Sequence, residues 1–201
     1  MVKKIGQWNK TRSLLSTPLA TFDRAIDAAV SQEAENFRKE VIRGLDSQAP
    51  GGKRLKKPSA LTLAGRKGRG TKALIDRGDL RRSVKKVQGP GAPGKRGYFV
   101  GVLRQARSRT GDSLVNIAAT HEFGASFSVK VTPAMRAAVM ATMREAGLTP
   151  SGSGKGATVY AIRIPKRPFL TPVANKLRRG AGRRMKRRIQ VNLGLLGKVM
   201  G

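Results

Sequence analysis

The hydrophobic positions in the first quarter of the chain recur at helical spacing. From about Thr17 to Leu45, apolar side chains return every three or four residues. Thr17 is a good capping residue, Pro18 suits the first helical position, and Gly44 is a plausible stop. The pattern predicts one long amphipathic helix. We interpret its apolar stripe as ordinary core; the alternative is that part of it packs on a neighbouring subunit. The stripe consists of Leu19, Phe22, Ile26, Ala29, Val30, Phe37 and Val41.

Three short segments further along have the composition of strands. Residues 73–88 predict a turn of helix that leads into a strand near Ser83–Val87. A Pro/Gly turn, GPGAPGKRG, separates this strand from Tyr98–Leu103, which is rich in β-branched and aromatic residues. A third strand is expected over Thr158–Ile164, where two prolines end it. Antiparallel pairing is the natural arrangement for these strands.

Two further helices are expected in the second half. Thr132 and Pro133 favour a helix start, and the helix is predicted over Ala134–Ala146. The last helix is predicted from Pro172 to about Leu193, although Gly180 and Gly182 each weaken it by roughly 1 kcal/mol relative to Ala. Its apolar stripe is made of Ala174, Leu177, Ala181, Met185 and Ile189.

These elements predict an α+β fold in one domain. A small antiparallel β-sheet is flanked by the long N-terminal helix and the C-terminal helix, with basic extended loops. A chain of 201 residues suffices for one domain and is marginal for two. Within this domain, 1–201, we expect an N-terminal arm over 1–16, a basic flexible loop over 47–72, a Gly/Ser loop over 147–157, and a basic C-terminal helix and tail over 172–201.

The charge is strongly positive and unevenly distributed. The net charge is +31, and from Ser47 onward the chain holds 34 of its 42 basic residues but only five of its 11 acidic ones. Such a field attracts nucleic acid, anionic lipid or acidic protein surfaces. The candidate DNA-facing or partner-facing residues are Lys53, Arg54, Lys56, Lys57, Arg66, Lys67, Arg69, Arg178, Arg179, Arg183, Arg184, Arg187 and Arg188.

Composition also excludes several classes of protein. Without cysteine there is no disulfide framework and no thiolate metal site, which fits a reducing compartment. No apolar run approaches the roughly 20 residues that span a bilayer, and the first residues lack the apolar stretch of a signal peptide. We therefore expect an unsecreted protein with no membrane partner.

Motifs for catalysis fail on inspection. His121 is the single histidine, and no second one follows at the spacing of a helical zinc site, so a structural hydrogen bond is its expected role. Lys155 resembles the end of a phosphate-binding loop, but Gly156 stands where a magnesium-binding hydroxyl belongs. Asp76 and Asp79 lie beside arginines, which favours ion pairing or turn capping over acid/base chemistry. We expect no enzyme, no catalytic residue, no cofactor and no metal.

Three segments, read in order, produce a resemblance. They are Leu74–Val84 (LIDRGDLRRSV), Ala119–Gly124 (ATHEFG) and Ile164–Leu170 (IPKRPFL). The three resemble signatures of the tail-completion and virion-morphogenesis proteins of Mu-like and related long-tailed phages, and we call them the first, second and third signatures. The resemblance spans about half of the chain.

The resemblance implies an α+β structural subunit of a virion. It would form a ring in the neck, at the head-tail junction, or at the end of the tail tube, as a tail-completion, tail-terminator or connector protein. The implied partners are further copies of the chain, six being the expected number, together with neck, connector and tail tube proteins, and packaged DNA bound non-specifically. The implied location is the virion, after assembly in the host cytoplasm. The residues expected to serve structure and assembly are Gly78, Leu80, His121, Glu122, Phe123, Gly124, Ile164, Pro165, Arg167, Pro168, Phe169 and Leu170.

The last two signatures are typical of packing corners. Pro165 and Pro168 restrict the backbone, and Phe169 places a bulky group directly after a strand. We expect His121 and its neighbours to close a strand in a turn where Gly124 needs a positive φ. These corners either complete the fold of one subunit or contact the next one. The strongest rival function is a basic nucleic-acid-binding protein of nucleoid or ribosomal type, which explains the charge but lacks the aromatic RNA-binding motifs.

Overall fold

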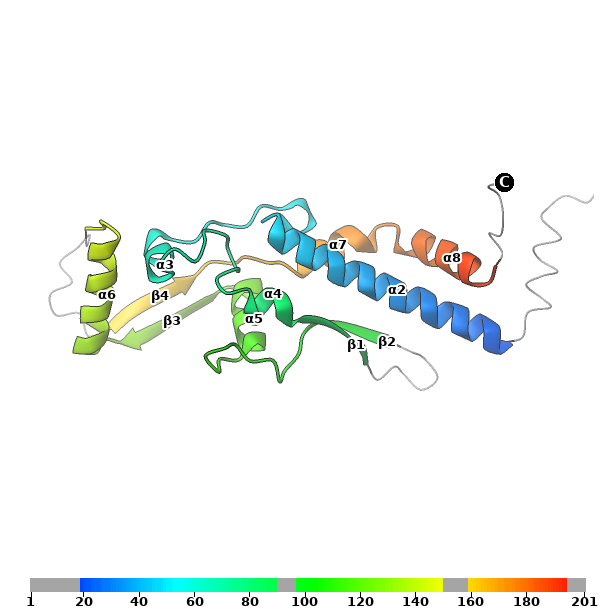
Figure 1. Cartoon of the computed structure of the whole chain (residues 1–201), viewed down its shortest axis with the longest axis horizontal. Coiled ribbons are helices and arrows are strands. Elements are labelled where there is room, and N and C mark those ends of the chain that lie inside the picture. Colours follow the sequence, from blue (N-terminus) through cyan, green and yellow to red (C-terminus); the bar gives the residue numbers. More distant parts are fainter. Residues whose placement is uncertain (1–18, 90–96, 150–158, 195–201) are drawn as a thin grey trace, which may run out of the picture. The chain divides into compact units, whose positions relative to one another are not determined.

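The computed structural model describes residues 19–89, 97–149 and 159–194 (Figure 1). The chain divides into two compact units. The first unit is built from the described residues within 1–37, 86–100 and 177–201, and the second from those within 38–85 and 101–176. Over the described residues the fold is α+β, with seven α-helices and two antiparallel sheets of two strands each. The α+β prediction is confirmed, with two small sheets in place of the expected one.

Helix α2 (Leu19–Asp46) is the long helix that the hydrophobic pattern predicts. Thr17 and Pro18, the expected start, lie outside the described residues. The helix continues past Gly44, which was expected to stop it. A Cβ at Gly44 would lie 2.7 Å from Cα of Pro50, so glycine serves there for close approach of the backbone. The side chains of Ala25, Ala29, Val41 and Leu45 are buried, whereas Leu19 is exposed.

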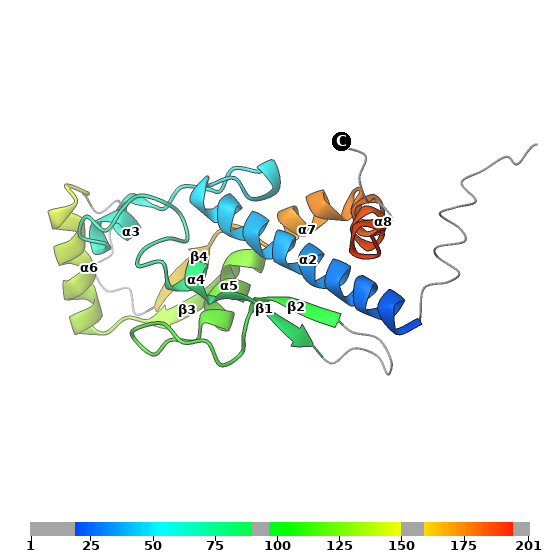
Figure 2. The same ribbon diagram turned by 45° about the vertical axis from the view of Figure 1, so that its right-hand side comes forward.

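The second unit contains two pairs of packed helices and one sheet. Helix α3 (Ala60–Gly65) packs on α6 (Pro133–Glu145), and α4 (Asp79–Ser83) packs on α5 (Leu114–Phe123). Strands β3 (Ala125–Lys130) and β4 (Val159–Ile164) pair in antiparallel register, with Ala125 opposite Ile164, and lie side by side in Figures 1 and 2. Helix α7 (Thr171–Arg178) follows β4. The buried apolar side chains of this unit are Val41, Leu45, Ala73, Leu80, Val84, Val102, Leu114, Ala118, Phe169 and Val173.

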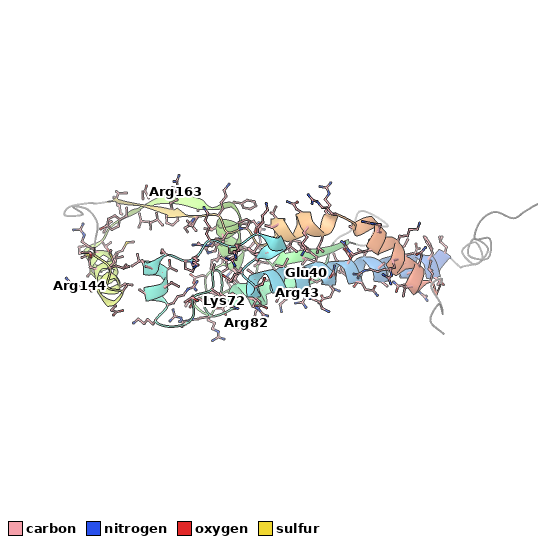
Figure 3. All side chains as sticks on the ribbon, turned by 90° about the horizontal axis from the view of Figure 1, so that it is seen from above. Glu40, Arg43, Lys72, Arg82, Arg144 and Arg163 are labelled. Carbon is pink, nitrogen blue, oxygen red and sulfur yellow. The ribbon has the colours of Figure 1, made fainter. Side chains whose placement is uncertain are left out.

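The segment 47–72, expected to be a flexible loop, contains local structure. A 3-10 helix, η1 (Pro50–Gly52), precedes α3. The hydroxyl of Ser59 accepts from the backbone N–H of Thr62 at 3.2 Å and caps α3. Lys72, labelled in Figure 3, donates from its ammonium to the backbone oxygen of Asp46 at 2.8 Å. A local cap and contacts to the end of α2 therefore order this basic segment.

In the first unit, α8 (Ala181–Asn192) lies on α2. The side-chain amide of Asn192 donates to the backbone oxygen of Ala25 at 3.2 Å. Strands β1 (Val84–Gly89) and β2 (Gly97–Val102), which belong to this unit from Lys86 and up to Val100, form the other sheet and match the predicted hairpin strands. The ammonium of Lys86 lies 5.2 Å from the ring centroid of Tyr98 and donates to the hydroxyl of Ser31 at 3.0 Å.

Two local predictions were wrong. The C-terminal helix is interrupted, because Gly180 adopts φ 75° and α8 begins after it. A left-handed glycine ends an α-helix far more readily than it continues one. Residues Leu114–Phe123 form a helix, so the second signature closes a helix and not a strand. Its buried residues Leu114 and Ala118 are four positions apart, as on one face of a helix. The helix predicted over Ala134–Ala146 is confirmed as α6, with the hydroxyl of Thr132 accepting from the N–H of Met135.

None of the helices in the described part of the chain has the length and apolar character needed to cross a membrane.

Candidate functional site

The carboxylate of Glu122 joins the second and third signatures. It accepts hydrogen bonds from three successive backbone N–H groups: Phe169 at 2.8 Å, Leu170 at 3.1 Å and Thr171 at 2.8 Å. These groups lie at the start of α7, where helical N–H groups have no partner inside the helix. Glu122 comes from the last turn of α5 and is only 8% exposed. A buried acid at the end of one helix therefore caps the start of another.

The environment keeps this carboxylate ionised. Burial acts to raise the pKa of Glu122, but the hydrogen bonds from Thr171, Phe169 and Leu170 outweigh it, and the pKa lies below its ordinary value. A carboxylate that accepts several N–H bonds is stabilised in its charged form. Glu122 therefore serves as a fixed anionic acceptor in the core of the second unit.

Arg167 extends the same connection to the basic segment. Its backbone N–H donates to the backbone oxygen of His121 at 2.7 Å. Its guanidinium donates to the backbone oxygens of Lys56 at 2.8 Å and Lys57 at 3.0 Å. Arg167 thus holds the segment before α3 against the third signature, while the exposed lysine side chains of that segment stay free of this contact.

Gly124 is required by the geometry of this corner. It has φ 77°, and an added Cβ would lie 2.9 Å from Cγ of Lys166 and 3.2 Å from the backbone oxygen of Ile164. The positive φ expected at this glycine is therefore present. Phe169 is fully buried, at 0% exposure, and is the largest of the fully buried side chains. Phe123, by contrast, is 68% exposed.

We define the corner as Glu122, Gly124, Arg167 and Phe169 with the backbone N–H groups of residues 169–171. It contains four of the ten structural residues expected from the second and third signatures. Pro165, Pro168 and Leu170 are half-buried beside it, and Ile164 pairs with Ala125 at the end of the sheet.

The first signature meets His121 around a cavity of about 390 Å³. Gly78, with φ 78°, stands before α4, and Leu80 is buried at 6% exposure. The guanidinium of Arg69 pairs with Asp76 at 2.9 Å, and the carboxylate of Asp79 pairs with Arg82. Both aspartates therefore form ion pairs, as expected from the sequence. The cavity is lined by Arg66, Arg69, Leu74, Asp76, Arg77, Gly78, Asp79, Leu80, Ser108, Thr110, Leu114, Ile117 and His121.

The ring of His121 is neutral at physiological pH. Burial lowers its pKa, and the positive charge of Arg167 lowers it further. Its Nδ1 atom is buried and has no hydrogen-bond partner among the residues that the structure describes. The structural hydrogen bond expected of this side chain is therefore not made by Nδ1, although the backbone oxygen of His121 accepts from the N–H of Arg167. Over the described residues, no group of three or more histidine or acidic side chains could hold a metal ion.

The expected partner-facing basic residues fall into two groups. Arg184 and Arg188 pair with Glu33 of α2 at 2.6 Å and 3.2 Å, and Nη1 of Arg66 donates to three backbone oxygens, so these three stabilise the fold itself. The others are exposed: Lys53, Arg54, Lys56, Lys57, Lys67, Arg69, Arg178, Arg179, Arg183 and Arg187.

Sequence reasoning missed two partnerships. The carboxylate of Asp46 accepts from the guanidinium of Arg81 at 2.6 Å and 2.7 Å, and the pair lowers the pKa of Asp46. The capping role of Glu122 was also missed. The sequence does hold a signal for this role, since Glu122 is the single acid between Asp112 and Glu145. It stands in an apolar segment, where an unpaired charge is costly, so a partner for its carboxylate could have been expected.

Comparisons of the chain with protein-family models, with curated proteins and with solved structures find no match.

Proposed function

We propose that this chain is a structural subunit of a tailed-phage virion that forms a ring in the neck, at the head-tail junction, or at the tail end. One observation carries the proposal. The three signatures, spread from Leu74 to Leu170, meet in the second unit: Glu122 binds the third signature, and His121 borders a cavity with the first. Because these distant segments contact one another in the fold, we expect the three signatures to serve one common function.

The corner suits a subunit that works by packing. A closed ring needs each copy to present two different surfaces at a fixed angle, because a small angular error prevents closure. Glu122 joins α5 to the start of α7 through one buried and two part-buried hydrogen bonds, and the backbone N–H of Arg167 joins the segment after β4 to α5. Such a junction resists bending, as ring closure requires.

Helix α5 and the β3–β4 sheet carry exposed apolar side chains. Phe123 is 68% exposed, Phe127 46% and Val159 49%. In the antiparallel register, Phe127 lies opposite Ile162 and shares its face of the sheet. Val159 lies three positions before Ile162 on β4 and therefore lies on the other face of the sheet. Because these two side chains lie on opposite faces, we assign the face that carries Phe127 to contacts between copies, where association would bury this exposed aromatic side chain.

The remaining basic residues face neighbouring virion proteins or packaged DNA. With Arg184 and Arg188 paired to Glu33, the exposed face of α8 carries Arg183, Lys186 and Arg187. No acidic residue follows Glu145 in the sequence. Uncompensated charge of this kind suits non-specific contact with phosphates or acidic surfaces.

Electron microscopy and analytical ultracentrifugation of the purified chain test the proposal. Closed rings that form without DNA are expected, and Phe127→Ser should prevent them while leaving the circular dichroism spectrum unchanged. Exposed Arg163, labelled in Figure 3, provides the control: Arg163→Gln should still form rings. A chain that stays monomeric at all concentrations, and in the presence of other neck proteins, would contradict the proposal.

A second candidate is a nucleic-acid-binding protein of nucleoid or ribosomal type, which the exposed basic face of α8 favours. In that case, duplex DNA binds the monomer without sequence preference. The logarithm of the binding constant would then fall steeply with the logarithm of salt concentration. Substituting Arg183 and Arg187 with Gln would reduce that slope. Rings without DNA would favour the first candidate, and DNA-dependent complexes without rings the second.

A further inference from the structure

The cavity beside His121 has an apolar floor and a cationic rim. Its volume of about 390 Å³ falls in the ~300–1,000 Å³ range of ligand pockets. Helices α4 and α5 and the segment before α4 supply the floor, and the residues between α3 and α4 supply the rim. The floor is made of Leu74, Leu80, Leu114 and Ile117, and the rim cations are Arg66, Arg69 and Arg77.

Only one of the three rim cations is available to a ligand. Nη1 of Arg66 donates to the backbone oxygens of Gly70, Lys72 and Ile75, and the guanidinium of Arg69 is paired with Asp76. Arg77 is exposed, and its guanidinium has no hydrogen-bond or ion-pair partner among the described residues. The two acids of the lining are already neutralised, Asp76 by Arg69 and Asp79 by Arg82. Arg77 is therefore the rim guanidinium whose N–H groups have no acceptor among the described residues, and its charge, like those of Arg66 and Arg69, acts on Asp76.

Two further features of this cavity are unfavourable in the free chain. Leu74 has φ 61°, a left-handed conformation that costs a non-glycine residue about 1–3 kcal/mol. Nδ1 of His121 is buried without a partner among the described residues, and a buried unpaired polar atom is destabilising. Such features are retained where the surrounding structure or a ligand compensates for them.

We propose that this cavity binds an acidic peptide segment of a partner protein, with one apolar side chain on the floor and an adjacent carboxylate on Arg77. The chemistry matches on both counts: four aliphatic side chains accept an aliphatic group, and a free guanidinium pairs with a carboxylate through two parallel hydrogen bonds. The paired aspartates at the rim disfavour the continuous charge of a phosphate backbone. The site does not depend on ring formation.

The partner is a different protein and not a second copy of this chain. The chain has 11 acidic residues against 42 basic ones, and several of the acids are already bonded within the fold. The carboxylates of Glu33, Asp46 and Glu122 are among these. An acidic partner supplies the carboxylate that this chain has too few free acids to provide.

The single histidine provides a direct readout. His121 is the only source of imidazole proton signals in the NMR spectrum of the full chain, and its ring lines the cavity. At pH 7.5 its lowered pKa keeps the ring neutral, so small changes in pH do not move the signal. The probe is 4-methylpentanoate, which carries a leucine-like group and a carboxylate. Its neutral amide, 4-methylpentanamide, tests the charge, and acetate tests the apolar floor.

The expected result is a saturable shift of the His121 signal with 4-methylpentanoate, and binding about tenfold weaker for the amide and for acetate. Arg77→Gln should weaken binding of 4-methylpentanoate about tenfold and leave the amide unchanged. Arg163→Gln, an exposed arginine outside the cavity, should bind both probes like the wild type. Ile117→Ser should weaken both.

Three outcomes would overturn the proposal. The first is an absence of any saturable shift with 4-methylpentanoate, and the second is equal binding by the Arg77→Gln and wild-type chains. The third is a shift produced by a duplex oligonucleotide that depends on Arg77, which would assign the cavity to nucleic acid. Ring formation by electron microscopy is scored separately, so failure here leaves the proposed function standing, and the reverse also holds.

Discussion

A glutamate anchors a helix in each of the two units, and the two anchors differ in environment. In the second unit, buried Glu122 accepts three backbone N–H bonds at the start of α7. In the first unit, Glu33 pairs with the guanidinium groups of Arg184 and Arg188, whose side chains are 33% and 25% exposed. Backbone donors cannot move away, whereas arginine side chains can exchange a carboxylate for water. The first anchor should therefore be strong and insensitive to salt, and the second weak and screened by salt.

The largest expected effect comes from the apolar part of the corner. Phe169→Ala removes a fully buried ring and should lower the free energy of unfolding by about 3–5 kcal/mol. Leu170→Ala, at a half-buried position, should cost less. Chemical denaturation of the two variants measures the difference, and ring assembly should fail for Phe169→Ala. Equal stability of Phe169→Ala and wild type would remove the corner from the argument.

The second-largest loss of stability is expected when the charge of Glu122 is removed. Glu122→Gln replaces an ionised acceptor with an amide whose NH₂ group cannot accept from the N–H groups of residues 169–171. The loss should be roughly 2 kcal/mol at pH 7. Glu33→Gln is the matched control, since it removes a charge of the same type from an anchor in the other unit.

The pH dependence of stability distinguishes these two variants. The pKa of Glu122 is lower in the folded chain than its ordinary value of 4.5. The stabilisation is therefore fully present above pH 4.5 and is lost as the pH falls through the folded pKa. Glu122→Gln should flatten the stability profile below pH 5, as followed by urea denaturation at several pH values. An unchanged slope in this variant would show that Glu122 is not ionised in the fold.

A smaller loss of stability is expected from a substitution at Gly124, which tests the need for glycine at this positive φ. Gly124→Ala introduces a Cβ at φ 77° that meets Lys166 and the backbone oxygen of Ile164. The left-handed conformation alone costs roughly 1–2 kcal/mol. Gly111→Ala is the control, because it has φ 89° but nothing within 4 Å of the added Cβ. Thermal unfolding should show a larger loss for Gly124→Ala; equal losses would mean that the contact with Lys166 is unimportant.

Local features of the fold could be predicted from the sequence, and distant partnerships could not. The spacing of apolar residues and the Thr132–Pro133 pair predicted α2 and α6, because periodicity and capping act within a few residues. The capping of α7 by Glu122 joins residues 47 to 49 positions apart, and no local pattern encodes it. The break at Gly180 was treated as a weak point of one helix, since a single glycine costs a helix little unless it adopts a left-handed conformation.

In the candidate site, too, the sequence predicted which residues matter but not which distant residues contact one another. The second and third signatures marked the correct residues, but their contact required the fold: Arg167 reaches back 46 positions to the backbone oxygen of His121. The basic residues were expected to act as uniform blocks. The structure separates Arg184 and Arg188 from Arg183 and Arg187 because α8 turns alternate arginines toward Glu33. Helical phase decides this, and the sequence did not reveal which face would meet α2.

The smallest effect is expected for Glu33→Gln, and it concerns α8 alone. Removing this carboxylate leaves Arg184 and Arg188 without their anion, so α8 loses two ion pairs with α2 while retaining the bond from Asn192 to Ala25. Because the pairs are partly exposed, the loss should be at most about 1 kcal/mol at low salt and should vanish near 1 M salt, where the Debye length is about 3 Å. Hydrogen exchange of the backbone amides of residues 181–192 measures this loss. In dilute buffer the protection in Glu33→Gln should be severalfold lower than in the wild type, and at high salt the two should be equal. Glu40→Gln removes an acid from the same helix that pairs with Arg43, and should leave exchange in α8 unchanged. If Glu33→Gln lowered protection equally at high and low salt, the anchor would act by packing, and the contrast with Glu122 would fail.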